Sequence, residues 1–228
     1  MTRAVLTAVA GAAAMLVVAG GLAASESAVA LVRDVTERAS VTGRVSGETF
    51  RLPLRVFEYL LDHPELTTQV TQALKIGPYR VWREAGGLRV DDGAGAVGDF
   101  SIVSAAAGRR VVYLRGHYKK GAVPAIHGRA VAILEYTARP APDGRALITP
   151  TITGFLRIDN AVIDMLSRIL RPVAAAKAER LARRVVGDFA KTARAIDADP
   201  AHVHDELRRR PEVRPDELEA LRRLLDLP

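Results

Sequence analysis

Apolar and polar residues alternate along most of the chain between positions 79 and 158. In the last part of this region Ile148, Ile152 and Leu156 share one parity, while threonines and arginines occupy the other. A period of two is typical of β-strands with one buried face. The pattern predicts strands at residues 79–85, 88–91, 97–105, 109–118, 125–137 and 145–158. Because short turns join them, the strands are predicted to form an antiparallel meander.

A helical period flanks the meander on both sides. Residues 45–52 are predicted to form a first strand, and two short helices follow at 53–62 and 64–74. From 160 to 196 the apolar residues lie on one stripe of a long helix, with a break predicted at Arg171-Pro172. A long amphipathic helix needs the sheet as its partner. The predicted fold is therefore α+β, a curved antiparallel sheet of about six to seven strands wrapped on a long C-terminal helix.

Both ends of the chain differ from this domain, which we place at 45–198. Arg3 precedes a run of small apolar residues, and Ala28-Val29-Ala30 follows it, which predicts a signal peptide over 1–30. Residues 31–44 are predicted to be a linker. The alternative is an uncleaved membrane anchor, and both readings place the domain outside the cytoplasm, in the periplasm or secreted. Residues 199–228 are predicted to be a polar, partly helical and dispensable tail.

Composition narrows the possible partners. The chain has 228 residues, a net charge of +7 and no cysteine, which excludes disulfides and a cysteine nucleophile. The positive charge favours anionic partners, and the basic helix and tail suggest contact with an anionic membrane surface. Nucleic acid is not an expected partner, because the chain is predicted to be exported and lacks the combination of aromatic and basic residues that binds nucleic acid.

The apolar parity of the sheet is rich in small residues, namely Gly116, Ala130, Ala132, Ala146 and Gly154. Small side chains beneath a helix permit either close packing or a cavity lined by aliphatic groups. The predicted ligand-binding residues on the sheet are Leu114, Gly116, Tyr118, Ala132, Leu134, Ile148, Ile152 and Leu156. Those on the helix are Val162, Leu166 and Val173. Trp82, the single tryptophan, is expected either at the cavity mouth or at an edge of the core.

Other motifs point to no chemistry. The glycines of 93–98 match a dinucleotide-binding pattern, but a strand follows them instead of a helix, which indicates a hairpin turn. His117 and His127 supply only half of a zinc site. Apart from Tyr118 and Tyr136, the apolar parity of the sheet is expected to hold almost no ionisable side chain. We therefore predict no catalytic residue, no metal and no cofactor.

The segment 51–66, which runs from a strand end at Pro53 through Val56-Phe57 to Asp62-His63-Pro64-Glu65, resembles the opening of the START-like (SRPBCC) superfamily. The resemblance covers residues 45–196 and implies a helix-grip fold with a deep apolar cavity between sheet and last helix. The break at Pro172 and the scarcity of aromatic residues depart from the pattern.

Together these features predict an exported protein that holds a hydrophobic ligand, such as a fatty acid, sterol-like lipid, quinone or phospholipid tail, and that takes part in lipid transport. Two alternatives stay open. One is a cyclase-like or hydrolase-like enzyme in the same cavity, and the other is a basic interaction module of the cell envelope without a cavity.

Overall fold

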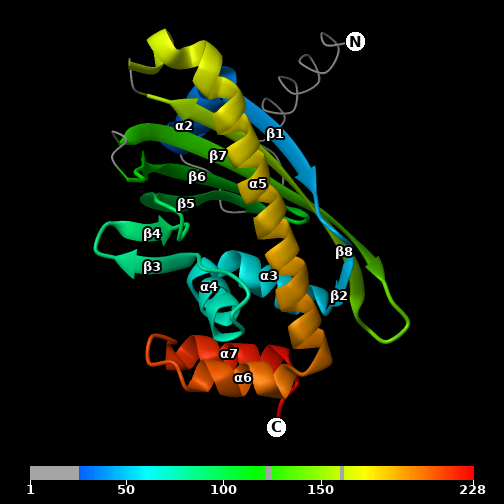
Figure 1. Cartoon of the computed structure of the whole chain (residues 1–228). Coiled ribbons are helices and arrows are strands. Elements are labelled where there is room, and N and C mark those ends of the chain that lie inside the picture. Colours follow the sequence, from blue (N-terminus) through cyan, green and yellow to red (C-terminus); the bar gives the residue numbers. More distant parts are fainter. Residues whose placement is uncertain (1–25, 122–124, 160–161) are drawn as a thin grey trace.

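The computed structural model describes residues 26–121, 125–159 and 162–228, and within the last helix of the domain it leaves out the side chains of 162–174 and 177. The helices are α2 (Glu26–Glu37), α3 (Leu54–Asp62), α4 (Pro64–Ala73), α5 (Val162–Ala198), α6 (Pro200–Arg208) and α7 (Pro215–Leu224). The strands are β1 (Val41–Ser46), β2 (Phe50–Leu52), β3 (Arg80–Glu84), β4 (Gly87–Asp91), β5 (Ala96–Ala106), β6 (Arg109–Tyr118), β7 (Ile126–Pro140) and β8 (Ala146–Ile158). Figure 1 shows α5 lying across the sheet, with α6 and α7 at the lower, C-terminal end of α5.

The strands form one open antiparallel sheet in the order β1-β8-β7-β6-β5-β4-β3, with β2 also paired to β8. The α+β fold and the antiparallel meander are confirmed. The described sheet has eight strands, more than the six to seven expected, because the segment predicted as a single strand at 45–52 forms β1 and β2. The chain bends between them at Gly47, where an added Cβ would lie 3.0 Å from Pro150 and 3.1 Å from Val186 of α5. A glycine there lets the strand approach the helix closely.

Helices α3 and α4 form where the helical period predicted them. Pro64 occupies the first turn of α4, where a missing N–H costs no hydrogen bond. The Thr67 hydroxyl donates to the backbone oxygens of Leu60 at 2.5 Å and His63 at 3.1 Å, which ties the two helices together. Their apolar faces, including Phe57 and Leu66, are fully buried.

Helix α5 runs without interruption from Val162 to Ala198, so the predicted break at Arg171-Pro172 is wrong. A proline removes one hydrogen bond, and a helix of 37 residues keeps the others. The C-terminal half of α5 packs against β1, β2 and β8. There Val186, Ala190 and Ile196 are buried.

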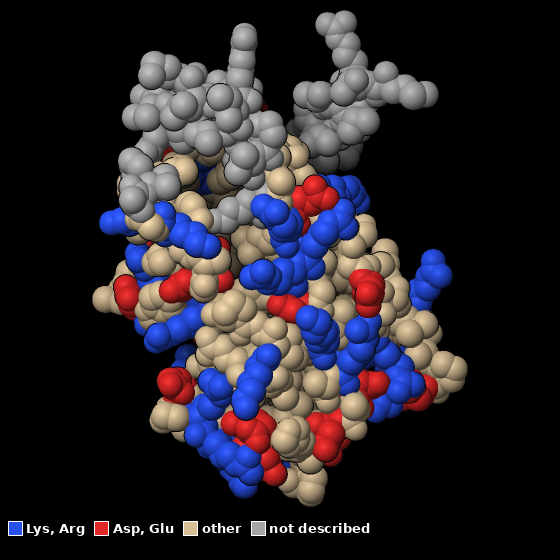
Figure 2. Space-filling model, in the orientation of Figure 1, with Lys and Arg blue, Asp and Glu red and all other residues tan. Residues whose placement is uncertain are grey.

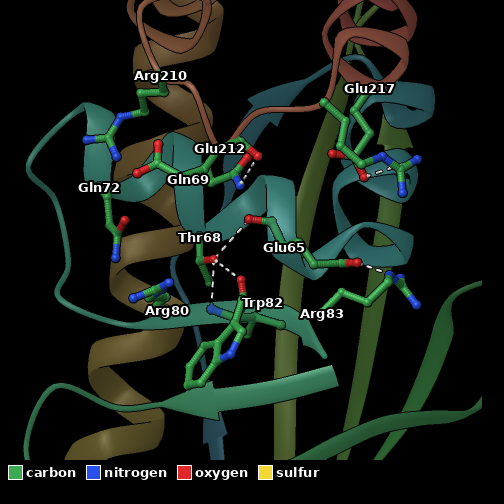
Figure 3. Close-up of a pocket in the computed structure, with 12 residues that line it drawn as sticks. Glu65, Thr68, Gln69, Gln72, Arg80, Trp82, Arg83, Arg210, Glu212 and Glu217 are labelled. Atoms are coloured by element: carbon green, nitrogen blue, oxygen red, sulfur yellow. Dashed lines mark hydrogen bonds and ion pairs between the residues drawn. The ribbon is translucent and has the colours of Figure 1, made fainter. Parts of the chain in front are cut away.

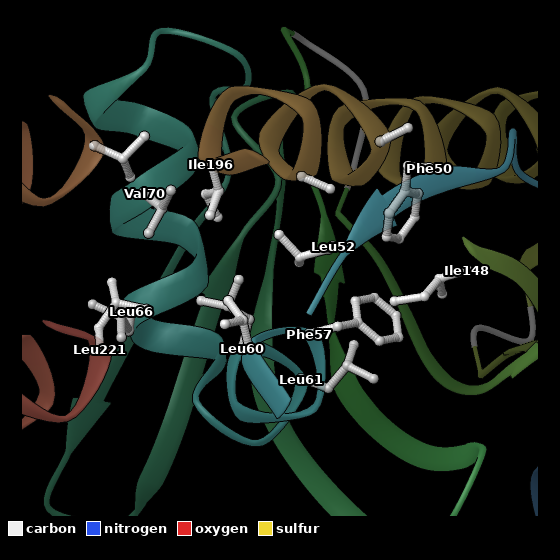
Figure 4. Packing of buried hydrophobic residues seen from close by; sticks show 14 of the residues in the cluster. Phe50, Leu52, Phe57, Leu60, Leu61, Leu66, Val70, Ile148, Ile196 and Leu221 are labelled. Carbon is white, nitrogen blue, oxygen red and sulfur yellow. The ribbon is translucent and has the colours of Figure 1, made fainter. Parts of the chain in front are cut away.

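The C-terminal segment is part of the core, which corrects the expectation of a dispensable tail at 199–228. The Asp199 carboxylate accepts the backbone N–H of His202 at 2.9 Å and caps α6. Leu207 and Leu221 are 0% exposed and belong to the same apolar cluster as Leu66 of α4. Figure 4 shows Leu221 beside Leu66. The segment is polar only on its outer side.

The segment predicted as a linker at 31–44 holds the end of α2 and the start of β1. Helix α2 covers the opposite face of the sheet from α5, where Val35 packs with Val111, Val131 and Phe155. Asp34 anchors the helix through ion pairs to Arg129 at 2.8 Å and Arg157 at 2.5 Å. Burial acts to raise the pKa of Asp34, but the hydrogen bond from Arg157 and the charges of Arg157, Arg129 and Arg38 together lower the pKa below its ordinary value.

We predict that Leu221→Ala lowers the free energy of unfolding by about 2–5 kcal/mol, because it opens a cavity in a sealed core. The control is Leu147→Ala, since Leu147 is 42% exposed and the same truncation there should cost less than about 1 kcal/mol. Urea denaturation measures both. Equal stability of the two variants would show that α7 does not pack as described.

Candidate functional site

The candidate site is the face of the sheet that lies toward α5, called here the inner face. The strand register places Ile152, Gly154 and Leu156 of β8 opposite Leu134, Ala132 and Ala130 of β7. The next strand, β6, continues these rows with Arg110, Val112 and Leu114. Of the predicted ligand-binding residues, the inner face holds Leu114, Gly116, Tyr118, Ala132, Leu134, Ile148, Ile152 and Leu156. The structure therefore brings these sheet positions onto one surface.

The inner face is covered unevenly. Ile148 is 0% exposed, because it lies in the apolar cluster formed with β2 and α3. Leu114, Ala132, Ile152 and Leu156 are only half-buried. Aliphatic side chains of a central strand are usually buried when a helix packs directly upon them. The inner face is thus sealed at the end near Ile148 and only partly covered beyond it.

Two glycines mark open space on this partly covered region. Gly43 of β1 pairs with Gly154 of β8, which pairs in turn with Ala132 of β7. An added Cβ at Gly43 or Gly154 would meet no described atom within 4 Å. The part of the inner face over the row Gly43–Gly154–Ala132 is therefore open next to these glycines and is called here the groove.

Gly116 has a different role from the one predicted. An added Cβ there would lie 2.3 Å from the backbone oxygen of Val97 and 2.7 Å from Cα of Gly98. Gly98, Gly116 and Gly128 lie side by side on β5, β6 and β7, and all three have a backbone atom within 2.8 Å of the added Cβ position. Glycines in one cross-strand row let the strands bend sharply. Gly116 is required by the shape of the sheet and contributes no space for a ligand.

The remaining predicted residues do not join the groove. Trp82 lies on the opposite face of β3, where its indole N–H donates to Glu84 at 2.8 Å. This corrects its expected place at the cavity mouth. Tyr118 lies on the inner face but at the far end of β6, close to the position of an added Cβ at Gly95. Val162, Leu166 and Val173 belong to α5, and their side chains lie outside the described residues.

A polar cluster around the buried Arg110 side chain lies at the sealed end of the inner face and was missed by the sequence reasoning. The Arg110 guanidinium donates to both carboxylate oxygens of Asp62 at 2.6 and 2.9 Å and to the backbone oxygens of Ala106 and Arg109. The hydrogen bond to Asp62 raises the pKa of Arg110. The alternation in β6 already indicates that Arg110 faces inward, because Arg110 is two positions before Val112 and therefore lies on the same apolar face.

Tyr136 also faces this end, and its hydroxyl donates to the Glu58 carboxylate at 2.5 Å. Burial, together with this hydrogen bond, raises the pKa of Tyr136 to about 12. Its hydroxyl is therefore neutral at physiological pH. The cluster ties α3 to the sheet through the Arg110–Asp62 ion pair and the hydrogen bond from Tyr136 to Glu58.

The other sequence motifs take structural roles. The glycine-rich segment forms the β4–β5 hairpin turn, as predicted, and the Asp92 carboxylate accepts the N–H groups of Ala94 and Ala96. His117 and His127 face each other with ring centres 5.6 Å apart. No group of three His, Asp or Glu side chains suited to a metal occurs in the part of the chain that the structure describes.

Comparisons with known proteins add no family. No protein-family model matches the chain, and no curated protein is similar to it. None of the helices within 26–121, 125–159 and 162–228 has an apolar stretch long enough to cross a membrane. The large antiparallel sheet with its long helix is compatible with the helix-grip fold that the resemblance implies.

The two glycine environments lead to a matched prediction. Gly154→Ala should leave the free energy of unfolding unchanged or raise it by about 0.5 kcal/mol, because the methyl group enters open space and restricts the unfolded chain. Gly116→Ala should lower it by about 1–3 kcal/mol, because the methyl group collides with backbone. Thermal and urea denaturation measure both. A destabilised Gly154→Ala variant would mean that the groove floor is packed.

Proposed function

We propose that this protein binds a hydrophobic molecule in the groove between the inner face of the sheet and α5. The observation that carries the proposal is the open space above Gly43 and Gly154 on an otherwise aliphatic face. A void lined by aliphatic groups is a poor site for water, and an apolar ligand fills it favourably. Each methylene group transferred there from water contributes about 0.8 kcal/mol.

The charges around the groove favour one orientation of such a ligand. Glu58 and Asp62 lie at the sealed end, and their partners Tyr136 and Arg110 already engage them. An anionic head group placed there would face the Glu58 carboxylate, whose partner Tyr136 is neutral, while Arg110 is already paired with Asp62. We therefore expect the apolar part of an amphiphile to lie on Gly154 and Ala132, with its head group directed to the opposite end of the groove.

The same groove is the basis for assigning the chain to the helix-grip class, which we propose as the finer description of its α+β fold. The short helices α3 and α4 follow the first strands, and α5 follows the meander, in the order that the resemblance implies. The inner face offers no unpaired carboxylate among its described residues, and this favours a carrier over a cyclase-like or hydrolase-like enzyme.

Contact with an anionic membrane surface is part of the proposal. Figure 2 shows Lys and Arg side chains gathered along the exposed side of α5. Arg180, Arg184, Lys191 and Arg194 are exposed and lie within one stripe of the helix. A cationic stripe is attracted to anionic lipid headgroups, and salt screens that attraction. It would bring the groove to a membrane that supplies or accepts the ligand.

Binding is tested by Gly154→Phe, which should fill the groove and abolish uptake of a fluorescent fatty acid while the melting temperature stays close to that of the parent. Uptake is followed by fluorescence on transfer from vesicles. The matched control is Thr153→Phe, which adds the same ring to the other face of the same strand and should leave uptake unchanged. No uptake by the parent, or equal uptake by both variants, would refute the proposal.

We also propose export, with cleavage after Ala30. Such cleavage would remove the first turn of α2 and keep Val32, Asp34 and Val35, the residues that hold this helix to the sheet. N-terminal sequencing of the protein recovered from outside the cytoplasm should therefore begin at Leu31. Recovery of an intact Met1 would exclude cleavage, and recovery only from the cytoplasm would exclude export.

A further inference from the structure

A second pocket lies between α4, β3 and the loop that joins α6 to α7, away from the groove. Its volume is about 270 Å³. The wall includes Arg80, Trp82 and Arg83 of β3 and Arg210, Glu212 and Arg214 of that loop. The chain therefore brings four arginines into one small space, and two of them come from the C-terminal segment (Figure 3).

Two of these arginines are neutralised within the pocket wall. Arg83 donates to the Glu65 carboxylate at 2.5 Å. Arg214 forms ion pairs with Asp216 at 2.6 Å and with Glu217 at 3.8 Å. Burial raises the pKa of Glu217. The first pair joins β3 to α4 and the second lies at the start of α7, and both offer little charge to a ligand.

The other two arginines have no carboxylate partner among the described side chains. The Arg80 guanidinium lies 4.9 Å from the centre of the Trp82 ring, a cation–π contact that leaves its N–H groups available. Arg210 makes no side-chain hydrogen bond to any described residue, although it is half-buried. Figure 3 shows both guanidinium groups on the same side of the pocket, with Gln72 between them.

We propose that this pocket binds a small molecule through a phosphate or carboxylate group held by Arg80 and Arg210. The planar guanidinium presents paired N–H donors that match the oxygens of such groups. The side chain of Glu212 lines the pocket and forms no ion pair with the described residues, so it sets a limit on how much negative charge the site accepts. This site is separate from the proposed hydrophobic groove and does not depend on it.

The pocket exists only when the C-terminal segment is docked. The Gln69 side-chain amide donates to the backbone oxygen of Glu212 at 3.1 Å, which holds the α6–α7 loop against α4. Gln72 donates to the backbone oxygen of Tyr79 at 3.1 Å and holds α4 against the start of β3. These contacts hold the backbone segments that carry Arg80 and Arg210 against α4, so that both side chains start from fixed backbone positions in the wall.

Trp82 is the single tryptophan of the chain and lines the pocket, so its fluorescence reports on the site directly. The full chain is titrated with inorganic phosphate against chloride at constant ionic strength, and isothermal calorimetry measures the same affinity independently. Saturable binding is expected. Arg210→Gln should weaken it roughly tenfold or more, the loss typical of a charge-assisted hydrogen bond.

The matched control is Arg209→Gln, which removes the same charge from the neighbouring residue in the chain. Arg209 pairs with Glu206 and does not line the pocket. It should leave phosphate affinity within about twofold, since only distant screened charge changes. Glu212→Gln should strengthen binding, because it removes a carboxylate from the wall. No saturable binding of phosphate or acetate, or equal losses in the Arg209 and Arg210 variants, would overturn the proposal.

A third titration, with glycerol phosphate, distinguishes the sources of the anion. Tighter binding of the ester than of inorganic phosphate would support recognition of a lipid-type head group. Equal binding of the two would support recognition of the free anionic group. Fatty acid uptake by the Arg210→Gln variant should be unaffected, so failure of this site and failure of the hydrophobic groove give different results.

Discussion

One apolar cluster holds the structure together, and it lies at one end of the sheet. Strands β2 and β8 contribute four residues, the loop between α6 and α7 contributes Val213, and the helices from α3 to α7 contribute the rest of the cluster. Because these helices all bury their apolar faces at the same end, the other end of the inner face is left to α5 alone. The stability of the fold and the open space in the groove therefore do not compete for the same residues.

The shape of the sheet depends on glycines that do two opposite things. Gly98, Gly116 and Gly128 allow backbone to approach backbone, and any side chain there would collide. Gly43 and Gly154 lie beneath open space, and an added Cβ there would meet no described atom within 4 Å. The first set curves the strands, and the second set leaves room above them. Both features suit the proposed site, which requires a curved sheet with space beside a helix.

The C-terminal segment links the core to a second surface. Leu207 and Leu221 are buried in the main cluster, while Arg210 and Glu212 between them face a polar pocket. A loop held between two buried anchors can position charged side chains with little freedom. The segment therefore has a structural role through its apolar residues and offers a binding surface through its polar ones.

Much of the fold was predictable from local pattern. The period of two predicted all six strands of the meander, and the helical period predicted α3, α4 and α5. Both periods can be read locally because the spacing of apolar residues reflects which side of each element is buried. The sequence also identified the inner face, since Leu114, Ala132, Ile152 and Leu156 share it.

Tertiary structure alone decided whether each small residue of this face packs against backbone or lies beside open space. Gly116 and Gly154 have the same parity and chemistry, but one adjoins the backbone of β5 and the other adjoins space, and no local pattern records the distance to a neighbouring strand. The same reason explains the C-terminal helices, whose buried residues Leu207 and Leu221 pack with Leu66, far away in the chain.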